Sequence, residues 1–335
     1  LVEGGSPPRF LPTGHLVYAA GTTLKAIAFD PGSQETQGEP LSFANLEIAR
    51  APDNGAADFT VSESGTLLFL TSVSEREPRS LSWIDHQGNE EQVAIEPRVF
   101  AYPRFSPDGG RVALDVSGTG NRDIWILNLE RLTQVQLTDG PTEDMLPVWS
   151  PDGKRVFFAS NRAGSHDIYS QAADGATPAK LEFASPEFQA PQAFTADGSQ
   201  LIIYDRFKDT GILNLAQPDH LEPLLNSEFD ERLAQLSPDG HWIAYESDES
   251  GNQFEIILRS FPNVKERREK ISINGGRYPL WGLEGSNELY YVNLDGDMMA
   301  ASVTLSPDLK LGPVKKLFHF EKPTAGRSGR FFDLS

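Results

Sequence analysis

The chain has 335 residues, with 29 basic against 48 acidic side chains and a formal net charge of -19. Such an acidic surface repels phosphate backbones and anionic lipid headgroups, which excludes nucleic acid and membrane surfaces as favoured partners. The absence of cysteine excludes disulfides, thiolate metal sites and a cysteine nucleophile. No run approaches the ~18 apolar residues of a membrane span, so we expect no direct membrane insertion.

A glycine turn followed by a short apolar run recurs along the whole chain. The turn glycines are separated by 42 to 51 residues and are Gly14, Gly65, Gly109, Gly153, Gly198, Gly240 and Gly285. Self-similarity at this period indicates repeated supersecondary units. We therefore divide the chain into seven modules at approximately 8–56, 57–101, 102–145, 146–189, 190–232, 233–277 and 278–320, with 321–335 as a terminal strand or the start of a further module.

The modules share one sequence pattern, but they differ in how many of its residues they keep. The first, "PRFLPTGHLVYAA", keeps the prolines, the aromatic residue and the glycine, whereas the second, "FTVSESGTLLFLT", keeps only the glycine and the apolar run. The third and fourth are the plainest: "YPRFSPDGGRVALDV" and "LPVWSPDGKRVFFAS" each precede a polar loop, "DIW" or "DIY", and a final apolar segment. Degenerate copies follow in "QAFTADGSQLIIYDR", "AQLSPDGHWIAYES" and "PLWGLEGSNELYYVN".

The composition of each module predicts β-strands. Runs such as "RVFFAS" and "LIIYD" are short and rich in β-branched and aromatic residues, with Gly, Pro, Asp and Asn between them. No segment sustains a helical apolar stripe between capping signals. Four strands per period of about 44 residues predict the blade of a β-propeller. The expected fold is all-β, one propeller domain over residues 1–335 with four-stranded antiparallel blades, seven in number, with six or eight left open.

The repeated "SPDG" predicts a tight turn between the first and second strands of a blade. Proline presets φ at the first corner, Asp bonds back to the backbone, and Gly accepts a positive φ. A bulky residue repeated before this turn is expected to fill the contact between neighbouring blades. These residues are Phe10, Phe105, Trp149, Phe194 and Trp281, with Leu236 in one module. The motif is therefore expected to be scaffolding.

This array of "SPDG" turns and "DIW" or "DIY" strands resembles the WD40-like (PD40) repeats of TolB-type β-propellers over nearly the whole chain. The stretches "LPTGHLVYAAGTTLKAIAFD", "LSWIDHQGNEE" and "IAYESDESGNQFEIILRSFP" are similar to the propeller region C-terminal to the kinase domain of bacterial serine/threonine protein kinases. The resemblance implies a domain that senses or binds rather than catalyses. It favours a periplasmic or extracytoplasmic location, with a cytoplasmic one left open. Both ends parallel module segments, so we expect a part of a longer array.

Motifs for catalysis are absent from the sequence. It contains no G-x-S-x-G elbow and no G-x-x-x-x-G-K-[ST] loop, and "GTGNRD" lacks the third glycine of a dinucleotide loop. The six histidines have no short spacing typical of a zinc site: His15, His86, His166, His220, His241 and His319. We therefore expect no enzyme and no cofactor.

Two acidic segments leave calcium open as an alternative. "LDGD" at 294–297 and "SDESGN" at 247–252 place oxygen ligands at short spacing, but neither has the length of an EF-hand loop. Asp295 and Gly296, between two apolar runs, predict a hairpin turn instead. "KERREK" at 265–270 predicts a solvated outer strand or connection.

The segments just before each first strand are the candidate binding surface. In a propeller these connections lie on the face where the central funnel opens, and here they mix aromatic, acidic and arginine side chains. We expect a protein, peptide or small ligand on this face of a monomeric domain. The candidate residues are Tyr102, Arg104, Glu143, Asp144, Asp230, Arg277 and Tyr278. The alternative at each position is a residue that merely caps a solvent-filled channel.

The favoured function is a non-catalytic binding or sensor propeller, in the regulatory region of a larger bacterial signalling protein such as a kinase-like receptor. One alternative is a polysaccharide lyase or a peptidase-associated propeller with a site at the funnel, which requires histidines and a carboxylate around one axis. Another is a purely structural segment of a tandem-propeller array. Fold alone does not separate these functions.

Overall fold

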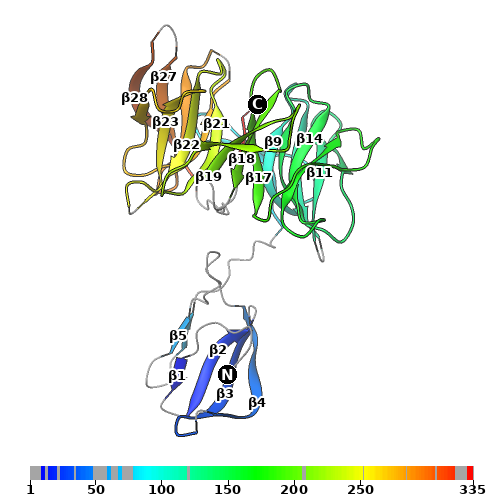
Figure 1. Cartoon of the computed structure of the whole chain (residues 1–335), viewed down its shortest axis with the longest axis vertical. Helices are drawn as coiled ribbons and strands as arrows, with labels where there is room; N and C mark the ends of the chain where they lie inside the picture. The colour runs from blue at the N-terminus through cyan, green and yellow to red at the C-terminus, as the bar shows by residue number, and fades with distance from the viewer. Residues whose placement is uncertain are drawn as a thin grey trace. The chain divides into compact units, whose positions relative to one another are not determined.

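The computed structural model describes residues 9–11, 14–20, 23–33, 35–47, 59–61, 67–69, 78–118, 121–205, 209–251, 253–283, 285–305, 308–320 and 330–334. The chain forms two compact units, Leu1–Glu77 and Pro78–Ser335 (Figure 1). All 28 elements within the described residues are β-strands, which confirms the all-β prediction. No helix in this part of the chain is long and apolar enough to cross a membrane.

The first unit contains the sheet of the first module. Its four strands pair antiparallel in chain order: β1 (Arg9–Leu11), β2 (His15–Ala20), β3 (Thr23–Asp30) and β4 (Glu35–Glu47). Leu16, Tyr18 and Ile27 form the buried core of this sheet. A separate antiparallel pair follows, β5 (Phe59–Val61) and β6 (Leu67–Phe69).

The second unit contains one strand pair and five four-stranded antiparallel sheets. The pair is β7 (Ser82–Ile84) and β8 (Glu90–Gln92). The first two sheets are β9 (Val99–Phe105), β10 (Arg111–Ser117), β11 (Arg122–Asn128), β12 (Thr133–Gln136), and β13 (Asp144–Trp149), β14 (Arg155–Ser160), β15 (Asp167–Ala172), β16 (Lys180–Phe183). The last three are β17 (Gln189–Phe194), β18 (Gln200–Asp205), β19 (Asp209–Asn214), β20 (Leu221–Leu225); β21 (Glu231–Leu236), β22 (Trp242–Ser247), β23 (Glu255–Ser260), β24 (Arg268–Lys270); and β25 (Arg277–Trp281), β26 (Glu288–Val292), β27 (Asp297–Thr304), β28 (Lys310–His319).

The strands can be grouped by the predicted modules, whose bounds stay a prediction. Six modules each form one four-stranded antiparallel sheet, and the module at 57–101 carries its four strands as the pairs β5–β6 and β7–β8. Seven modules of four strands therefore account for the 28 described strands, and antiparallel four-stranded blades are confirmed. That all seven modules belong to one domain over residues 1–335 stays a prediction.

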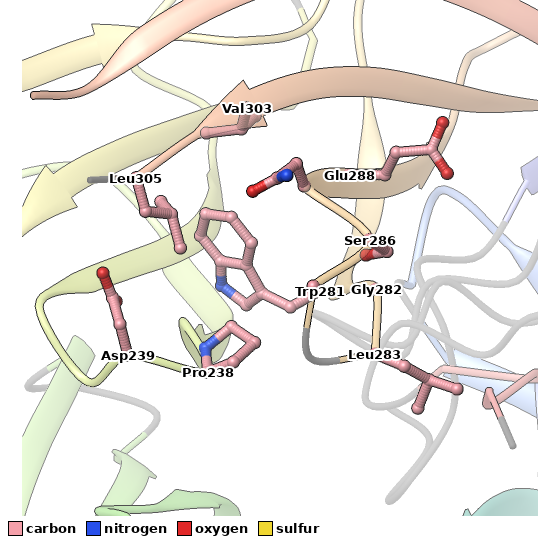
Figure 2. A pocket seen from close by; sticks show the side chains of 11 residues that line it. Pro238, Asp239, Trp281, Gly282, Leu283, Ser286, Glu288, Val303 and Leu305 are labelled. Carbon is pink, nitrogen blue, oxygen red and sulfur yellow. The ribbon is translucent and has the colours of Figure 1, made fainter. Parts of the chain in front are cut away.

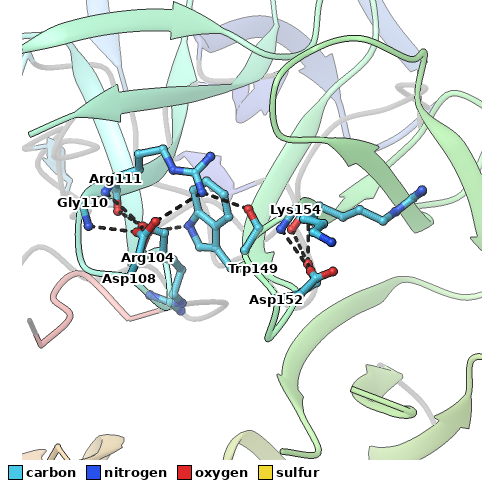
Figure 3. A network of polar contacts seen from close by, with 11 residues as sticks. Arg104, Asp108, Gly110, Arg111, Trp149, Asp152 and Lys154 are labelled. Carbon is cyan, nitrogen blue, oxygen red and sulfur yellow. Dashed lines mark hydrogen bonds and ion pairs between the residues drawn. The ribbon is translucent and has the colours of Figure 1, made fainter. Parts of the chain in front are cut away.

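The "SPDG" turn is closed by its own side chains. The Ser150 hydroxyl donates to Asp152 Oδ1 (2.6 Å) and accepts from the backbone amide of Arg155 (3.0 Å). Asp152 Oδ1 also accepts from the Lys154 amide (3.0 Å), while Gly153 takes a φ of 65°, which favours glycine. Figure 3 shows this turn beside its copy in the preceding blade. The motif is scaffolding, as predicted.

The aromatic residue before the turn joins neighbouring blades. Trp149 Nε1 donates to the carbonyl of Arg104 in the preceding blade (3.0 Å), and the Arg111 guanidinium lies 4.6 Å from the Trp149 ring centroid (Figure 3). Trp281 Nε1 donates in the same way to the carbonyl of Gln235 (3.2 Å). Each indole thus forms a hydrogen bond to the neighbouring blade in addition to its apolar contact. The predicted role between blades is confirmed for both tryptophans.

The first strand of each of the five sheets, the inner strand of its blade, shifts register against the second strand, and in four of the five the shift carries a positive φ. A non-glycine residue there has a φ between 51° and 60°, and the register with the second strand shifts; these residues are Tyr102, Leu146, Leu233 and Tyr278. A left-handed conformation costs free energy for such residues, so neighbouring groups must hold it. The Tyr278 amide, for example, donates to Glu246 Oε2 of the preceding blade (3.1 Å).

Residues 330–334 bridge the last and the first of the five sheets. The buried Arg330 guanidinium donates to the carbonyl of Pro279 on β25 (3.2 Å) and to Asp333 Oδ1 (3.1 Å). Asp333 Oδ2 accepts from the amide of Phe105 on β9 (2.8 Å), and Arg104 donates to the Arg330 carbonyl (3.3 Å). The segment therefore lies between β25 and β9. The sequence predicts a terminal strand or the start of a further module at 321–335, and the described residues 330–334 form no strand.

Candidate functional site

The first residues of four neighbouring inner strands lie at one end of these strands. They are Asp144 on β13, Gln189 on β17, Glu231 on β21 and Arg277 on β25, and these strands contact one another in that order. We call these positions, together with the residues beside them and the second-strand ends that face them, the rim. Inner strands of successive blades run in the same direction, so the rim residues lie at one end.

Polar atoms of the rim are buried without partners. Asp144 Oδ1, both amide atoms of Gln189 and Arg277 Nε have no hydrogen-bond partner among the described residues. Buried polar groups in proteins are almost always paired with protein, water or ligand. These rim atoms can therefore form hydrogen bonds to a ligand or to water.

Around β13 the rim is acidic. The fully buried Asp144 accepts a charge-assisted bond at Oδ2 from Arg162 (2.6 Å). Glu143 keeps 46% of its side chain exposed and lies with Oε2 3.7 Å from His166 Nε2. Burial lowers the pKa of His166, although the Glu143 carboxylate opposes this shift. Glu143 is thus accessible to a ligand, whereas Asp144 holds the loop that carries Arg162.

Between β21 and β25 the rim combines both charges with an aromatic ring. Arg232 donates to Glu246 Oε1 (2.7 Å) and pairs with Asp230 Oδ2 (3.2 Å), and Arg277 donates to the same Glu246 oxygen (3.2 Å). The two guanidiniums lie 4.3 Å and 5.2 Å from the Phe254 ring centroid. Burial raises the pKa of Asp230 against the opposing charge of Arg232. Asp230 and Arg277 remain partly exposed.

The other predicted residues lie against the scaffold. Tyr102 and Tyr278 are buried, and the Tyr278 ring meets Phe331 edge-on at 5.7 Å. The Arg104 guanidinium donates to the carbonyl of Pro103 (2.7 Å), and its burial, together with the charge of Arg330, lowers its pKa. The seven predicted residues therefore do not form one cluster. Glu143 and Asp144 lie around β13, and Asp230 and Arg277 lie between β21 and β25. Arg104 and Tyr278 contact residues 330–334, and Tyr102 packs with Met145 and Leu146.

Further rim residues lie outside the predicted segments. Arg162 follows the end of β14, Glu246 lies near the end of β22, and antiparallel register places Arg232 opposite Glu246. Antiparallel pairing could have predicted these residues, because it places the end of each second strand beside the start of the first strand. The segments upstream of the first strands therefore contain only part of the rim.

Metal ligands do not gather in the described part of the chain. No group of three or more His, Asp or Glu side chains there is placed to hold an ion. His86 Nε2 lies 3.2 Å from the Tyr290 hydroxyl, and His319 Nδ1 lies 2.8 Å from Asp297 Oδ1. Gly296, with a φ of 83°, belongs to the hairpin turn between β26 and β27, as predicted.

Two cavities of the second unit are lined by residues other than those of the rim. One of about 230 Å³ lies at the turn end of the last two blades, where Pro238, Trp281 and Leu305 face it (Figure 2). Gly282 stands there in place of the serine of other modules, so no hydroxyl closes the turn. The other, of about 480 Å³, lies beside β7 and residues 331–334.

The repeated four-stranded antiparallel sheets define a β-propeller. Residues 59–284 match the family model of the TolB beta propeller domain, PD40. This chain belongs to that family. No curated protein sequence matches it.

Solved structures share the fold. A putative TolB from Agrobacterium tumefaciens is 19% identical and has a TM-score of 0.55, and the match covers 69% of this chain and 84% of that one. TolB from Acinetobacter baumannii is 15% identical with a TM-score of 0.56, over 91% of this chain and 80% of that one. A prolyl endopeptidase is 15% identical with a TM-score of 0.51, over 93% of this chain and 50% of that one. At these identities the likeness is one of fold.

Proposed function

We propose that this chain is a non-catalytic binding propeller whose rim takes a peptide or an exposed segment of a partner protein. The observation that carries the proposal is the clustering of unpartnered buried polar atoms at the first residues of neighbouring inner strands. Accessible charges stand beside these atoms on Glu143, Asp230 and Arg277. A ligand that satisfies these groups gains hydrogen bonds that the unliganded rim lacks.

The rim chemistry indicates the kind of peptide. Glu143 and Asp230 suit a basic side chain, and Arg277 suits a carboxylate or a main-chain carbonyl. The Phe254 ring lies beside both guanidiniums and supplies an apolar surface within the same group. A segment with a basic and an acidic residue flanking an apolar one fits this order of charges.

We further propose that the propeller is the regulatory region of a larger bacterial signalling protein of the kinase-like receptor type. The support is the resemblance of three stretches of the sequence to kinase-associated propellers. Sequencing the reading frame around this segment tests the proposal. An upstream kinase domain supports it, and an adjoining hydrolase domain contradicts it.

A display library of short random peptides, selected on this chain, tests the binding function. The selected peptides are then measured by calorimetry against the double variant Glu143→Gln/Arg277→Ala and against Arg131→Ala, an exposed arginine away from the rim. We expect the double variant to lose about tenfold or more in affinity, because each charged contact contributes about 1 kcal/mol or more, and Arg131→Ala to bind as the parent does. Peptides that keep full affinity for the double variant contradict the proposal.

The same peptides distinguish binding from catalysis. Mass spectrometry after prolonged incubation with the chain is expected to show intact peptide. Cleavage that disappears in the double variant would instead establish a peptidase function at the rim. The fold shared with a prolyl endopeptidase makes this control necessary.

A further inference from the structure

His166 lies between two positions of the rim. It stands immediately before β15, and its Nε2 is 3.7 Å from Oε2 of Glu143, which precedes β13. Its backbone carbonyl accepts a hydrogen bond from the amide of Gln189, the first residue of β17 (2.8 Å). One histidine is therefore placed beside the starts of two neighbouring inner strands.

The His166 ring is largely enclosed. Its side chain is 21% exposed, and the ring lies 5.2 Å from the Phe188 ring, on the connection between β16 and β17 that also carries Glu187. Nε2 is buried and has no hydrogen-bond partner, because 3.7 Å is longer than a hydrogen bond. A small movement of the accessible Glu143 side chain brings its carboxylate within reach of this nitrogen.

The groups around the ring act on its charge in opposite directions. Burial is the largest effect and lowers the pKa of His166, and Arg122 on β11 acts in the same direction. The carboxylates of Glu143 and Asp167 oppose this shift because they stabilise an imidazolium. The ring is therefore neutral at pH 7.5 and gains its charge in mildly acidic solution.

The charge of His166 determines what Glu143 can bind. Beside a neutral ring, the carboxylate keeps its negative charge for a ligand. A protonated ring places a positive charge 3.7 Å from the carboxylate and gives Nε2 a hydrogen to donate. A basic group of a ligand then competes with the imidazolium for one carboxylate, so protonation and binding oppose each other.

We propose that His166 makes peptide binding at the rim dependent on pH. Neutral His166 leaves Glu143 available to the basic group of a peptide, whereas protonated His166 pairs with this carboxylate and weakens binding. The proposal rests on the peptide-binding function of the rim and adds its regulation. Linkage requires the reverse effect as well: a bound basic group must weaken proton binding by His166 by the same factor.

The first test needs no ligand. NMR of the whole chain with ¹³C-labelled histidine follows the protonation of all six histidines, and the signal that His166→Gln removes identifies His166. In Glu143→Gln the midpoint of His166 should fall by about 0.5 on the pH scale, because a carboxylate that stabilises the imidazolium is lost. The charge-matched control is Glu130→Gln, at an exposed position after β11, which should leave the midpoint unchanged. An unchanged midpoint in Glu143→Gln overturns the proposal.

The second test uses the peptide acetyl-GKFEG-amide, which has the order of charges proposed for the rim. Because Asp123 also titrates, with a pKa of about 6, the measurement is made on the whole chain with Asp123→Asn. Calorimetry about one pH unit above and below the His166 midpoint should show about threefold weaker binding at the lower pH. The difference should vanish in Asp123→Asn/His166→Gln, and saturating peptide should lower the His166 midpoint by about 0.5.

A peptide without the basic group, acetyl-GQFEG-amide, is the control and should bind equally at the two pH values. If acetyl-GKFEG-amide also binds equally at both, the pH dependence is overturned and the peptide site at the rim still stands. If it binds at neither, the order of charges proposed for the rim is wrong, and this proposal fails with it.

Discussion

At the scale of single residues, a carboxyl group near the rim is held in an unfavourable environment. Asp123, the second residue of β11, is buried, and Oδ2 accepts bonds from Asn121 (3.2 Å) and Gln136 (3.1 Å). Burial, with the neighbouring charge of Asp144, raises its pKa to about 6. The folded chain therefore keeps this carboxyl protonated to a higher pH than an unfolded chain does. Its contribution to the free energy of unfolding is lost as the pH rises through 6.

The variant Asp123→Asn removes this ionisation. We expect it to raise the free energy of unfolding by about 1 kcal/mol at pH 7.5, less than the full pKa shift implies because water reaches part of the group. The gain should shrink as the pH falls from 6 and vanish only well below the ordinary pKa of 3.8, where the parent carboxyl is protonated in both the folded and the unfolded chain. Urea unfolding at several pH values measures it, with the exposed Asp295→Asn as the charge-matched control. A loss of stability independent of pH would contradict this account.

At the scale of elements, the turn and its preceding aromatic residue explain why one module pattern is repeated. The turn satisfies its own backbone groups through Ser150 and Asp152, and the tryptophans at 149 and 281 each donate a hydrogen bond to the blade before their own. Both features are local in the sequence, since they need only a few adjacent residues in the right order. A blade can therefore be recognised from a short stretch.

The variant Trp149→Phe tests the hydrogen bond between neighbouring blades. It keeps an apolar ring but removes the indole bond to the Arg104 carbonyl, which is partly buried. We expect the free energy of unfolding to fall by about 1 to 2 kcal/mol, because a buried carbonyl loses its donor. Trp83→Phe, whose ring is partly exposed and stacked on Phe105, should change it by less than about 0.5 kcal/mol. Equal losses for the two variants would show that the indole bond contributes nothing.

At the scale of the whole second unit, residues 330–334 connect the two ends of the series of sheets. Arg330 and Asp333 form a buried ion pair whose remaining bonds reach β25 and β9. Breaking one side of such a pair leaves an uncompensated buried charge, which is strongly destabilising.

The variant Arg330→Met is therefore expected to lower the free energy of unfolding by about 3 kcal/mol or more. Replacing both partners, Arg330→Met with Asp333→Asn, should recover part of this loss because no unpaired charge remains. Thermal unfolding followed by circular dichroism measures both variants. A double variant less stable than the sum of the two single losses would contradict the ion-pair account.

The turns, the short antiparallel strands and the contact role of the two tryptophans were predictable from the sequence. Each depends on backbone preferences and side-chain periodicity over a few residues. The candidate segments upstream of the first strands were predictable for the same reason. Glu246 and Arg162 were not, because their position at the rim results from pairing between strands rather than from any local pattern.

By itself the sequence determined that this protein is a repeated all-β array, without a catalytic motif and with a turn that serves as scaffolding. Only the tertiary structure decided which side chains meet. It brought Arg104 to Arg330 across 226 positions of sequence and placed the guanidiniums of Arg232 and Arg277 on one phenylalanine ring. The physical reason is that local preferences act through adjacent residues, whereas a binding surface is made by blades that pack side by side.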